Sequence, residues 1–305
     1  MILDNIFPVF ALIGLGALLR RGGLTDAAFL RRGDRLVYYV FFPALLLWKI
    51  GGATGPATVP WRLWAAGLGT IVVMWLVGLS LIRILRVDPG RAGVLAQSTN
   101  RFNTYVAIAV VGNVQGDVGV ARLGELLGLA IPLCNVLGVV TMIWYRRGIL
   151  DQAQRTRMTL RALVSNPLIL ACAAGMLWSR LGPPFPVAVD NTLRLSASLT
   201  LPFALISIGG MLTLDGLRRH LSLAAAATAA KVLLMPLAGW WGLRLAGVEG
   251  PDALTAMLFF AMPASTAMYV LATELDGNLE FASAVIVLST AVSMASLSAV
   301  LLIFA

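Results

Sequence analysis

Two cationic side chains, Arg101 and Lys231, stand inside long apolar segments of this 305-residue chain. A charge within a bilayer costs about 2.5–3.5 kcal/mol on insertion scales, so such residues usually mark a pathway or a charged partner. Either cation could neutralise an anion, and the guanidinium of Arg101 could hold a carboxylate through two parallel hydrogen bonds. Two structural alternatives remain: Arg101 could extend to the membrane surface, and Lys231 could bind carbonyl groups at a helix end.

Arg101 lies in one of two polar interruptions that break apolar segments, at residues 98–105 and 261–266. Each follows a helix-starting proline, Pro89 or Pro251, by about 12 residues, which rise about 18 Å and reach the middle of a 30 Å core. Broken helix at that depth is tolerated where protein or a water-filled cavity satisfies the backbone, and half-helix N-termini suit an anion. The pair predicts a binding site; two kinked packing helices without a ligand are the alternative.

The elements that must position these residues are membrane helices. The chain is 59% hydrophobic and only 12% charged, whereas a soluble domain is about a quarter charged. Its apolar runs reach the roughly 20 residues that a spanning helix needs. We therefore expect an all-α polytopic membrane protein with ten transmembrane helices. The expected spans are 5–20, 34–51, 62–86, 90–114, 118–145, 161–180, 187–214, 220–246, 251–274 and 279–303.

The net charge of +9 indicates membrane topology rather than a nucleic-acid-binding face. Most basic residues fall in alternate loops, which the positive-inside rule assigns to the cytoplasm. They are Arg20, Arg21, Arg31, Arg32, Arg35, Arg83, Arg86, Arg91, Arg146, Arg147, Arg155, Arg157, Arg161, Arg218 and Arg219. We expect an inner-membrane protein with both termini on the extracytoplasmic side. No basic residue precedes Arg20, so the first span should remain as a helix.

A constant offset of 159 residues relates the two halves of the chain. It carries four residues onto four of the same type: Pro8, Gly16, Pro43 and Gly51 onto Pro167, Gly175, Pro202 and Gly210. Each half holds five predicted spans, an odd number, so the second copy would enter the membrane from the opposite side. We expect one transporter domain over 1–305, with inverted repeats at 1–150 and 160–305. Chance matches among glycines and prolines, which are common in membrane helices, are the alternative.

Five motifs resemble those of the auxin efflux carrier family, which includes plant PIN carriers and bacterial organic-acid carriers. They are NRFNTY at 100–105, IPLCNV at 131–136, SNPLI at 165–169, KVLLMP at 231–236 and MPA at 262–264. The resemblance covers the whole chain and implies ten helices in two inverted five-helix repeats, a fold shared with bile-acid sodium symporters. Helices 1, 2, 6 and 7 would form a scaffold. Helices 3–5 and 8–10 would form a mobile, elevator-type core in which broken helices 4 and 9 cross. The chain departs from the family where Ala109 replaces a frequent proline.

The same resemblance places asparagines of the crossing helix and the fifth span on the substrate, and these match Asn103 and Asn135. An amide donates and accepts hydrogen bonds, so it can hold a carboxylate without a further buried charge; a bond between helices, worth about 1 kcal/mol, is the alternative. Hydroxyl groups beside the interruptions could line the cavity. The full set of candidate substrate-binding residues is Asn100, Arg101, Asn103, Thr104, Tyr105, Asn135, Lys231, Pro263, Ala264, Ser265 and Thr266.

The chain is therefore expected to be a secondary active or potential-driven transporter of a small organic anion, a mono- or dicarboxylate or an auxin-like acid. The alternatives are a sodium-coupled symporter of the bile-acid-carrier type and, more remotely, a passive channel. An enzyme would need acidic, nucleophilic or metal-binding groups at one depth, but the acidic residues lie near span ends and His220 in a loop. Cys134 and Cys172 predict no disulfide or metal site, and no cofactor is expected. Sodium or proton coupling, transport direction and a homodimer are left open.

Overall fold

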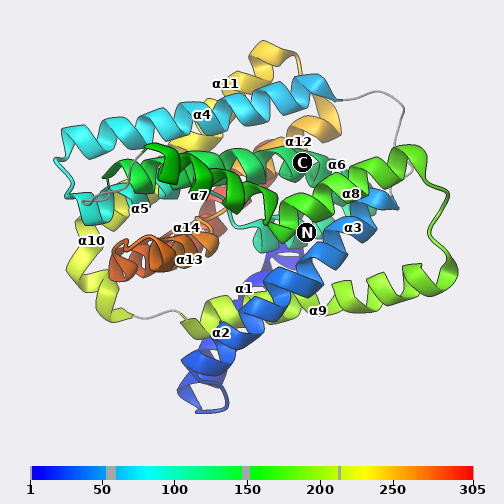
Figure 1. Cartoon of the computed structure of the whole chain (residues 1–305), viewed down its shortest axis with the longest axis horizontal. Helices are drawn as coiled ribbons and strands as arrows, with labels where there is room; N and C mark the ends of the chain where they lie inside the picture. The colour runs from blue at the N-terminus through cyan, green and yellow to red at the C-terminus, as the bar shows by residue number, and fades with distance from the viewer. Residues whose placement is uncertain (1, 53–59, 146–151, 212–213, 305) are drawn as a thin grey trace. The chain divides into compact units, whose positions relative to one another are not determined.

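The computed structural model describes residues 2–52, 60–145, 152–211 and 214–304, which form helices and contain no strand (Figure 1). The chain divides into two compact units, each assembled from three separate stretches of sequence. The first unit comprises Met1–Pro60, Tyr105–Leu129 and Ser165–Leu212. The second unit comprises Trp61–Thr104, Ala130–Val164 and Thr213–Ala305. Both units therefore draw on both halves of the chain.

Two long helix pairs build the first unit. Its elements, besides part of α6, are α1 (Ile2–Arg21), α2 (Ala27–Leu36), the π-helical η1 (Val37–Phe41), α3 (Phe42–Gly51), α8 (Pro167–Leu181) and α9 (Val187–Met211). Helix α1 packs along α9, and α3 packs along α8 (Figure 1). Asn166 caps α8 by accepting hydrogen bonds from the backbone N–H groups of Leu168 and Ile169, and Pro167 starts the helix as expected for its first turn.

Glycines allow these pairs to approach closely. A Cβ atom on Gly210 would lie 3.3 Å from the carbonyl oxygen of Gly16, and one on Gly51 would lie 3.6 Å from Cα of Gly175. At Gly209 a Cβ atom would come within 1.7 Å of the Ile13 carbonyl oxygen, which no rotamer change could relieve. Small residues let membrane helices pack backbone to backbone, so these positions hold α1 against α9 and α3 against α8.

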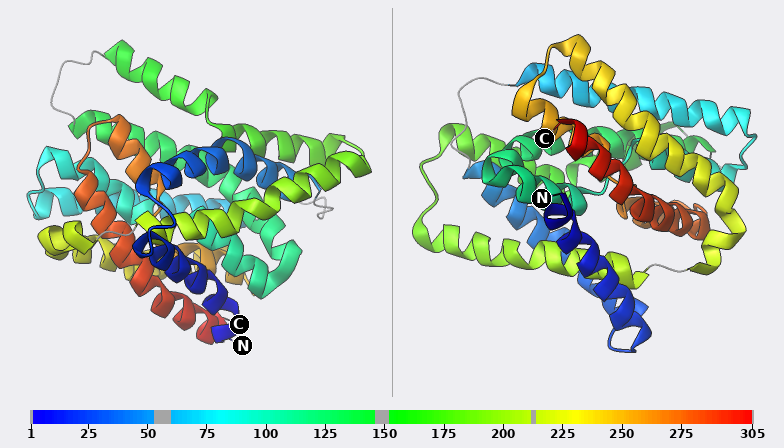
Figure 2. Two further views of the ribbon diagram at one scale, coloured as in Figure 1. Left: turned by 90° about the horizontal axis from the view of Figure 1, so that it is seen from below. Right: turned by 180° about the vertical axis from the view of Figure 1, so that it is seen from behind.

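The second unit holds the polar interruptions. Its elements, besides the remainder of α6, are α4 (Trp61–Ile84), α5 (Pro89–Asn100), α7 (Gln152–Val164), α10 (Leu214–Ala229), the π-helical η2 (Ala230–Leu234), α11 (Met235–Ala246), α12 (Gly250–Phe260), α13 (Ala267–Glu274) and α14 (Leu279–Phe304). Helix α4 packs along α5 and α11, and α10 packs along α14 (Figure 2). Small buried residues such as Ala92, Ala96, Ala224 and Ala284 form much of the core between them.

Five stretches of the described chain are long and apolar enough to cross a membrane: Trp61–Ile84, Pro89–Tyr145, Val187–Gly210, Leu217–Ala246 and Leu279–Phe304. The second of these joins α5 to α6 (Thr104–Tyr145), and Gly116 interrupts α6 with φ 64° and ψ −157°, a conformation that glycine adopts readily. The protein is thus a multi-pass membrane protein. The count of ten spans remains a prediction.

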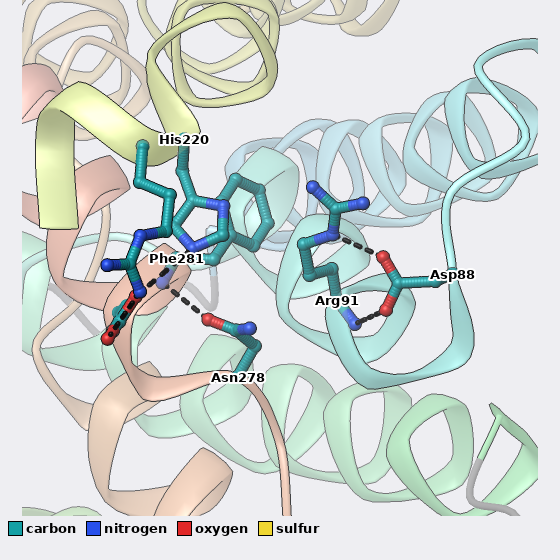
Figure 3. Close-up of polar contacts among 7 residues, drawn as sticks. Asp88, Arg91, His220, Asn278 and Phe281 are labelled. Atoms are coloured by element: carbon teal, nitrogen blue, oxygen red, sulfur yellow. Dashed lines mark hydrogen bonds and ion pairs between the residues drawn. The ribbon is translucent and has the colours of Figure 1, made fainter.

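The first turns of α5 and α14 are each capped by a side chain (Figure 3), and a backbone hydrogen bond joins the two caps. Asp88 caps α5, accepting from the Arg91 backbone N–H over 3.2 Å and pairing with its guanidinium. Asn278 caps α14, accepting from the Phe281 N–H over 2.8 Å, and its own N–H donates to the Gly90 carbonyl over 2.9 Å. Burial acts to raise the pKa of Asp88, but the Arg91 side chain outweighs it and lowers that pKa. These contacts fix the two helices that lead into the candidate site.

A second contact joins α10 to the start of α14 (Figure 3). The carboxylate of Glu280 lies 3.0 Å from the guanidinium of Arg219 and 3.6 Å from Nε2 of His220. The His220 ring meets Phe281 edge to face, with centroids 5.9 Å apart. Since Arg219 and Glu280 are both more than half exposed, screening keeps this ion pair weak.

Replacing Asn278 with alanine removes the cap of α14 while leaving its backbone bond to Gly90 in place. We expect a loss of about 1 kcal/mol in the free energy of unfolding, the usual value of such a cap. The measurement is the midpoint of thermal unfolding of purified Asn278→Ala protein. Asn191→Ala, at an exposed asparagine of α9, is the control and should leave the midpoint unchanged; equal midpoints for both variants would show that the cap contributes nothing.

Candidate functional site

Both predicted interruptions are present in the second unit. Helix α5 ends at Asn100 and α6 begins at Thr104, with Arg101 in an extended conformation between them. Helix α12 ends at Phe260 and α13 begins at Ala267. Residues 101–103 and 261–266 leave the helical conformation, so the second predicted interruption is confirmed over its full length, while 98–100 and 104–105 of the first remain helical.

The two interruptions contact each other through their backbones. The N–H of Asn103 donates to the carbonyl oxygen of Pro263 over 2.9 Å. Phe102, which directly precedes Asn103, packs its ring against that of Phe259, with centroids 4.2 Å apart. Each break frees backbone groups that must find hydrogen-bond partners inside a membrane protein. Here one freed group of each break is the partner of the other.

Helix α14 satisfies further groups of the second interruption. The backbone N–H of Ala264 donates to Oγ of Ser289 over 3.1 Å, and Oγ of Ser296 donates to the carbonyl oxygen of Ala261 over 3.1 Å. Ala261 and Ala264 are fully buried. Ser289 was absent from the predicted set, because a serine in an apolar helix gives no sequence signal that it will meet a break in another helix.

Arg101 is buried, with 7% of its surface exposed. Its guanidinium donates to Oε1 of Gln97 over 2.7 Å and to Oδ1 of Asn135. The side chain therefore turns into the protein instead of extending to the membrane surface. Gln97 lies four residues before Arg101, the helical spacing at which side chains meet; that spacing is the signal that could have identified it. Neutral amide oxygens orient the cation without cancelling its charge.

Lys231 is fully buried in the π-helical η2. Its Nζ donates to Sδ of Met235 over 2.7 Å, not to a carbonyl at a helix end. The N–H of Met235 bonds the carbonyl of Ala230, five residues back, and Pro236 has no N–H to offer, which favours the irregular turn. Single π-helical turns often occur at functional sites.

Cys134 connects Lys231 with the first interruption. Its buried Sγ donates weakly to the carbonyl oxygen of Asn100 over 3.8 Å, and it lies within electrostatic range of both Arg101 and Lys231. The structure thus brings the two predicted cations and Asn100 into one neighbourhood of the second unit. From the sequence, Cys134 predicts neither a disulfide nor a metal site, and no sequence pattern indicates this contact.

Asn100 is the last residue of α5 and is 1% exposed. In the described part of the chain, neither Oδ1 nor Nδ2 of its side chain has a hydrogen-bond partner. A buried polar atom left unpaired costs about 1–3 kcal/mol, so native proteins rarely keep one without a reason. A buried amide that lacks partners in the described chain and directly precedes the buried Arg101 is what a site for a polar ligand would show before the ligand binds.

The remaining predicted residues have more structural roles. Oγ of Ser265 accepts from the Ala267 N–H over 3.2 Å, and the Thr266 carbonyl accepts from the Tyr269 N–H over 3.0 Å; both contacts shape the start of α13. Thr104 is buried at the start of α6. Tyr105 falls in the first unit, where its ring lies 4.7 Å from that of Phe42.

Metal-binding and disulfide chemistry find no support in the described residues. They contain no group of three or more histidine, cysteine, aspartate or glutamate side chains that could hold a metal ion. Cys134 and Cys172 are both buried and reduced. The groups that could hold a ligand are the guanidinium, the ammonium and the amides.

The chain is similar to known membrane transport proteins. The sequence model of the family described as "Membrane transport protein" matches residues 151–301. A protein of Rhizobium meliloti (strain 1021) named "Putative malonate transporter" is 28% identical over 142 residues, which are 46% of this chain and 44% of that protein. The match therefore spans less than half the length of the relative. Residues 151–301 thus belong to the membrane transport protein family, of which the auxin efflux carriers are part.

Proposed function

We propose that the chain is a secondary carrier of small organic anions, dicarboxylates such as malonate among them, and that the anion binds beside Asn100, Arg101 and Lys231. The observation that carries the proposal is the buried amide of Asn100, which has no hydrogen-bond partner in the described part of the chain and lies in the same unit as the buried Arg101 and Lys231. A carboxylate would complete this arrangement, because it brings acceptor oxygens for Nδ2 of Asn100 and a negative charge for Lys231, which pairs with no carboxylate among the described residues.

The chemistry of the site favours two carboxylate groups. Arg101 presents a planar set of donors suited to one carboxylate, and the compact ammonium of Lys231 suits another as a point charge. Nδ2 of Asn100 could donate to either group. The name of the relative, which refers to malonate, agrees with a short dicarboxylate. Asn135, already bound to Arg101, would orient the guanidinium.

An elevator-type mechanism is part of the proposal. An elevator carries its binding site as a body, so all binding residues should lie in the moving unit. Asn100, Arg101, Asn135, Lys231 and Pro263 all fall in the second unit. The first unit contains the predicted scaffold spans 5–20 and 34–51 completely. It also contains the spans 161–180 and 187–214 apart from residues 161–164 and 213–214. The stretch Tyr105–Leu129, expected in the mobile core, also groups with the first unit.

The packing of the repeated glycines supports the proposal of inverted repeats. The offset of 159 carries Gly16 onto Gly175 and Gly51 onto Gly210. Gly16 approaches Gly210, and Gly51 approaches Gly175. Exchanging each residue for its repeat mate turns one contact into the other, which is what a two-fold relation between the copies would produce.

The finer assignments follow from the same proposal. The arginine distribution supports an inner-membrane position with both termini outside, and two copies of the chain could associate as a homodimer. A sodium-coupled symporter of the bile-acid-carrier type would use the same site with oxygen ligands at the interruptions. A passive channel would instead carry malonate at rates far above carrier turnover.

The direct test is binding of malonate to purified Asn100→Ala protein, measured by isothermal titration calorimetry. The variant removes one donor to the anion, so we expect the affinity to fall about tenfold, as for loss of one hydrogen bond to a charged group. Asn191→Ala, which lies in the first unit, should bind malonate as the unaltered protein does. Unchanged affinity in folded Asn100→Ala would remove Asn100 from the site.

A further inference from the structure

Lys231 lacks the partner that a buried ammonium normally has. It is fully buried, and the one hydrogen bond that its Nζ makes within the described residues goes to the thioether of Met235, which is a weak acceptor. Among the side chains that the structure describes, no carboxylate pairs with it. An unpaired charge in such surroundings is strongly disfavoured, and lysine, unlike arginine, can lose its proton.

No described carboxylate on the helices around Lys231 lies in electrostatic range of its ammonium. Elements α4, α5, α10, α11 and α14 pack against η2. Within the described residues, the titratable group that faces Lys231 is the thiol of Cys134, which also lies in electrostatic range of Arg101. Since Arg101 stays protonated at all physiological pH values, it adds positive charge to the neighbourhood. The charge around Lys231 therefore becomes less positive when a substrate anion binds.

We propose that Lys231 is the coupling residue of the carrier and that its proton crosses the membrane together with the substrate anion. The inference rests on the proposed function. With the anion bound, the Lys231 ammonium pairs with one carboxylate. When the anion leaves on the far side, the ammonium releases its proton to water there. The neutral amine returns, bonded to Met235, and takes up a new proton with the next anion. One proton therefore moves with each anion, while Arg101 remains charged throughout.

Proteoliposomes test this coupling with the full chain. With a pH-sensitive dye inside the vesicles, malonate entry should acidify the lumen, and an imposed inward proton gradient should drive malonate uphill. Lys231→Arg keeps the charge but cannot release the proton. Proton-driven accumulation by this variant should fall at least about tenfold, and by a larger factor than its exchange of internal for external malonate. Lys49→Arg changes the chain's other lysine, which pairs with Asp117, and should behave as the unaltered protein.

A second measurement covers the case in which Lys231→Arg fails to fold. Calorimetric titration of malonate in two buffers of different ionisation enthalpy reports the protons taken up on binding. The unaltered protein should take up protons between neutral and alkaline pH, and Lys231→Gln should take up none. The proposal is overturned if malonate flux moves no protons, if Lys231→Arg accumulates malonate as well as the unaltered protein, or if binding takes up no protons. Absence of flux for every carboxylate tested would instead contradict the carrier function itself.

Discussion

Arg101→Ala is expected to lower the affinity for malonate at least about a hundredfold, because it removes two charge-assisted hydrogen bonds worth about 1.5–3 kcal/mol each. The same change leaves Oε1 of Gln97 and Oδ1 of Asn135 without the donor that holds them. Both effects act on one site within the second unit. The affinity is measured by calorimetric titration of the purified, folded protein.

Two further variants separate charge from general damage. Arg101→Lys keeps the charge but loses the planar pair of donors, so its affinity should fall between those of the alanine variant and the unaltered protein. Arg91→Ala removes an arginine at the other end of α5, where it pairs with Asp88, and should bind malonate normally. If folded Arg101→Ala bound malonate as tightly as Arg91→Ala, the site would have to lie elsewhere.

Gly209→Ala is expected to have the largest effect on folding. Its new Cβ would lie 1.7 Å from the Ile13 carbonyl oxygen, and backbone atoms cannot move aside as a side chain can. Helix α1 would have to separate from α9, with a loss of about 3 kcal/mol or more in the free energy of unfolding. The thermal midpoint and the monodisperse fraction in detergent both report this loss.

Gly14→Ala is the matched control, since it adds the same methyl group to α1 where no heavy atom lies within 4 Å. Replacing an exposed helical glycine with alanine usually stabilises a helix by about 0.5–1 kcal/mol. Gly14→Ala should therefore be neutral or slightly stabilising while Gly209→Ala unfolds. Equal stability of the two variants would show that α1 and α9 do not pack in this way.

The interruptions were predictable because their causes are local. Polar and helix-breaking residues are clustered at 98–105 and 261–266 within apolar segments, which favours a local break, and the structure has breaks within both ranges. The hydrogen bond between Asn103 and Pro263 was not predictable in the same way. It joins residues far apart in the chain, and its formation depends on how the helices of the second unit pack.

The site shows the same division. Arg101 and Lys231 were identified because a charge in an apolar run stands out, and the partners Gln97 and Met235 each lie four residues away, a spacing that a helix brings together. The unpaired state of Asn100 depends on what surrounds it in three dimensions, so no sequence pattern could reveal it. Ser265 and Thr266 were expected to line a cavity, yet their described contacts are with the backbone of α13.

The number of spans is harder to establish because several predicted spans are divided. The stretch 34–51 is split into α2, η1 and α3, with Pro43 near the start of α3, and α8 has only 15 residues. A criterion that requires one long, continuous apolar helix therefore does not count a segment that a proline or a π-helical turn divides into shorter helices. The proposed symmetry between the halves, which the glycine contacts support, is a second guide to such segments.

The binding of the anion at Arg101 and Lys231 is tested most directly by solid-state NMR. In Lys49→Met protein labelled with ¹⁵N at lysine Nζ, Lys231 carries the only such label. Carboxyl-¹³C malonate is then bound, and the dipolar coupling between ¹³C and ¹⁵N is measured. We expect a coupling that corresponds to about 3–4 Å, the separation of a directly paired carboxylate and ammonium. Saturating malonate with no measurable coupling would contradict the assignment of the site.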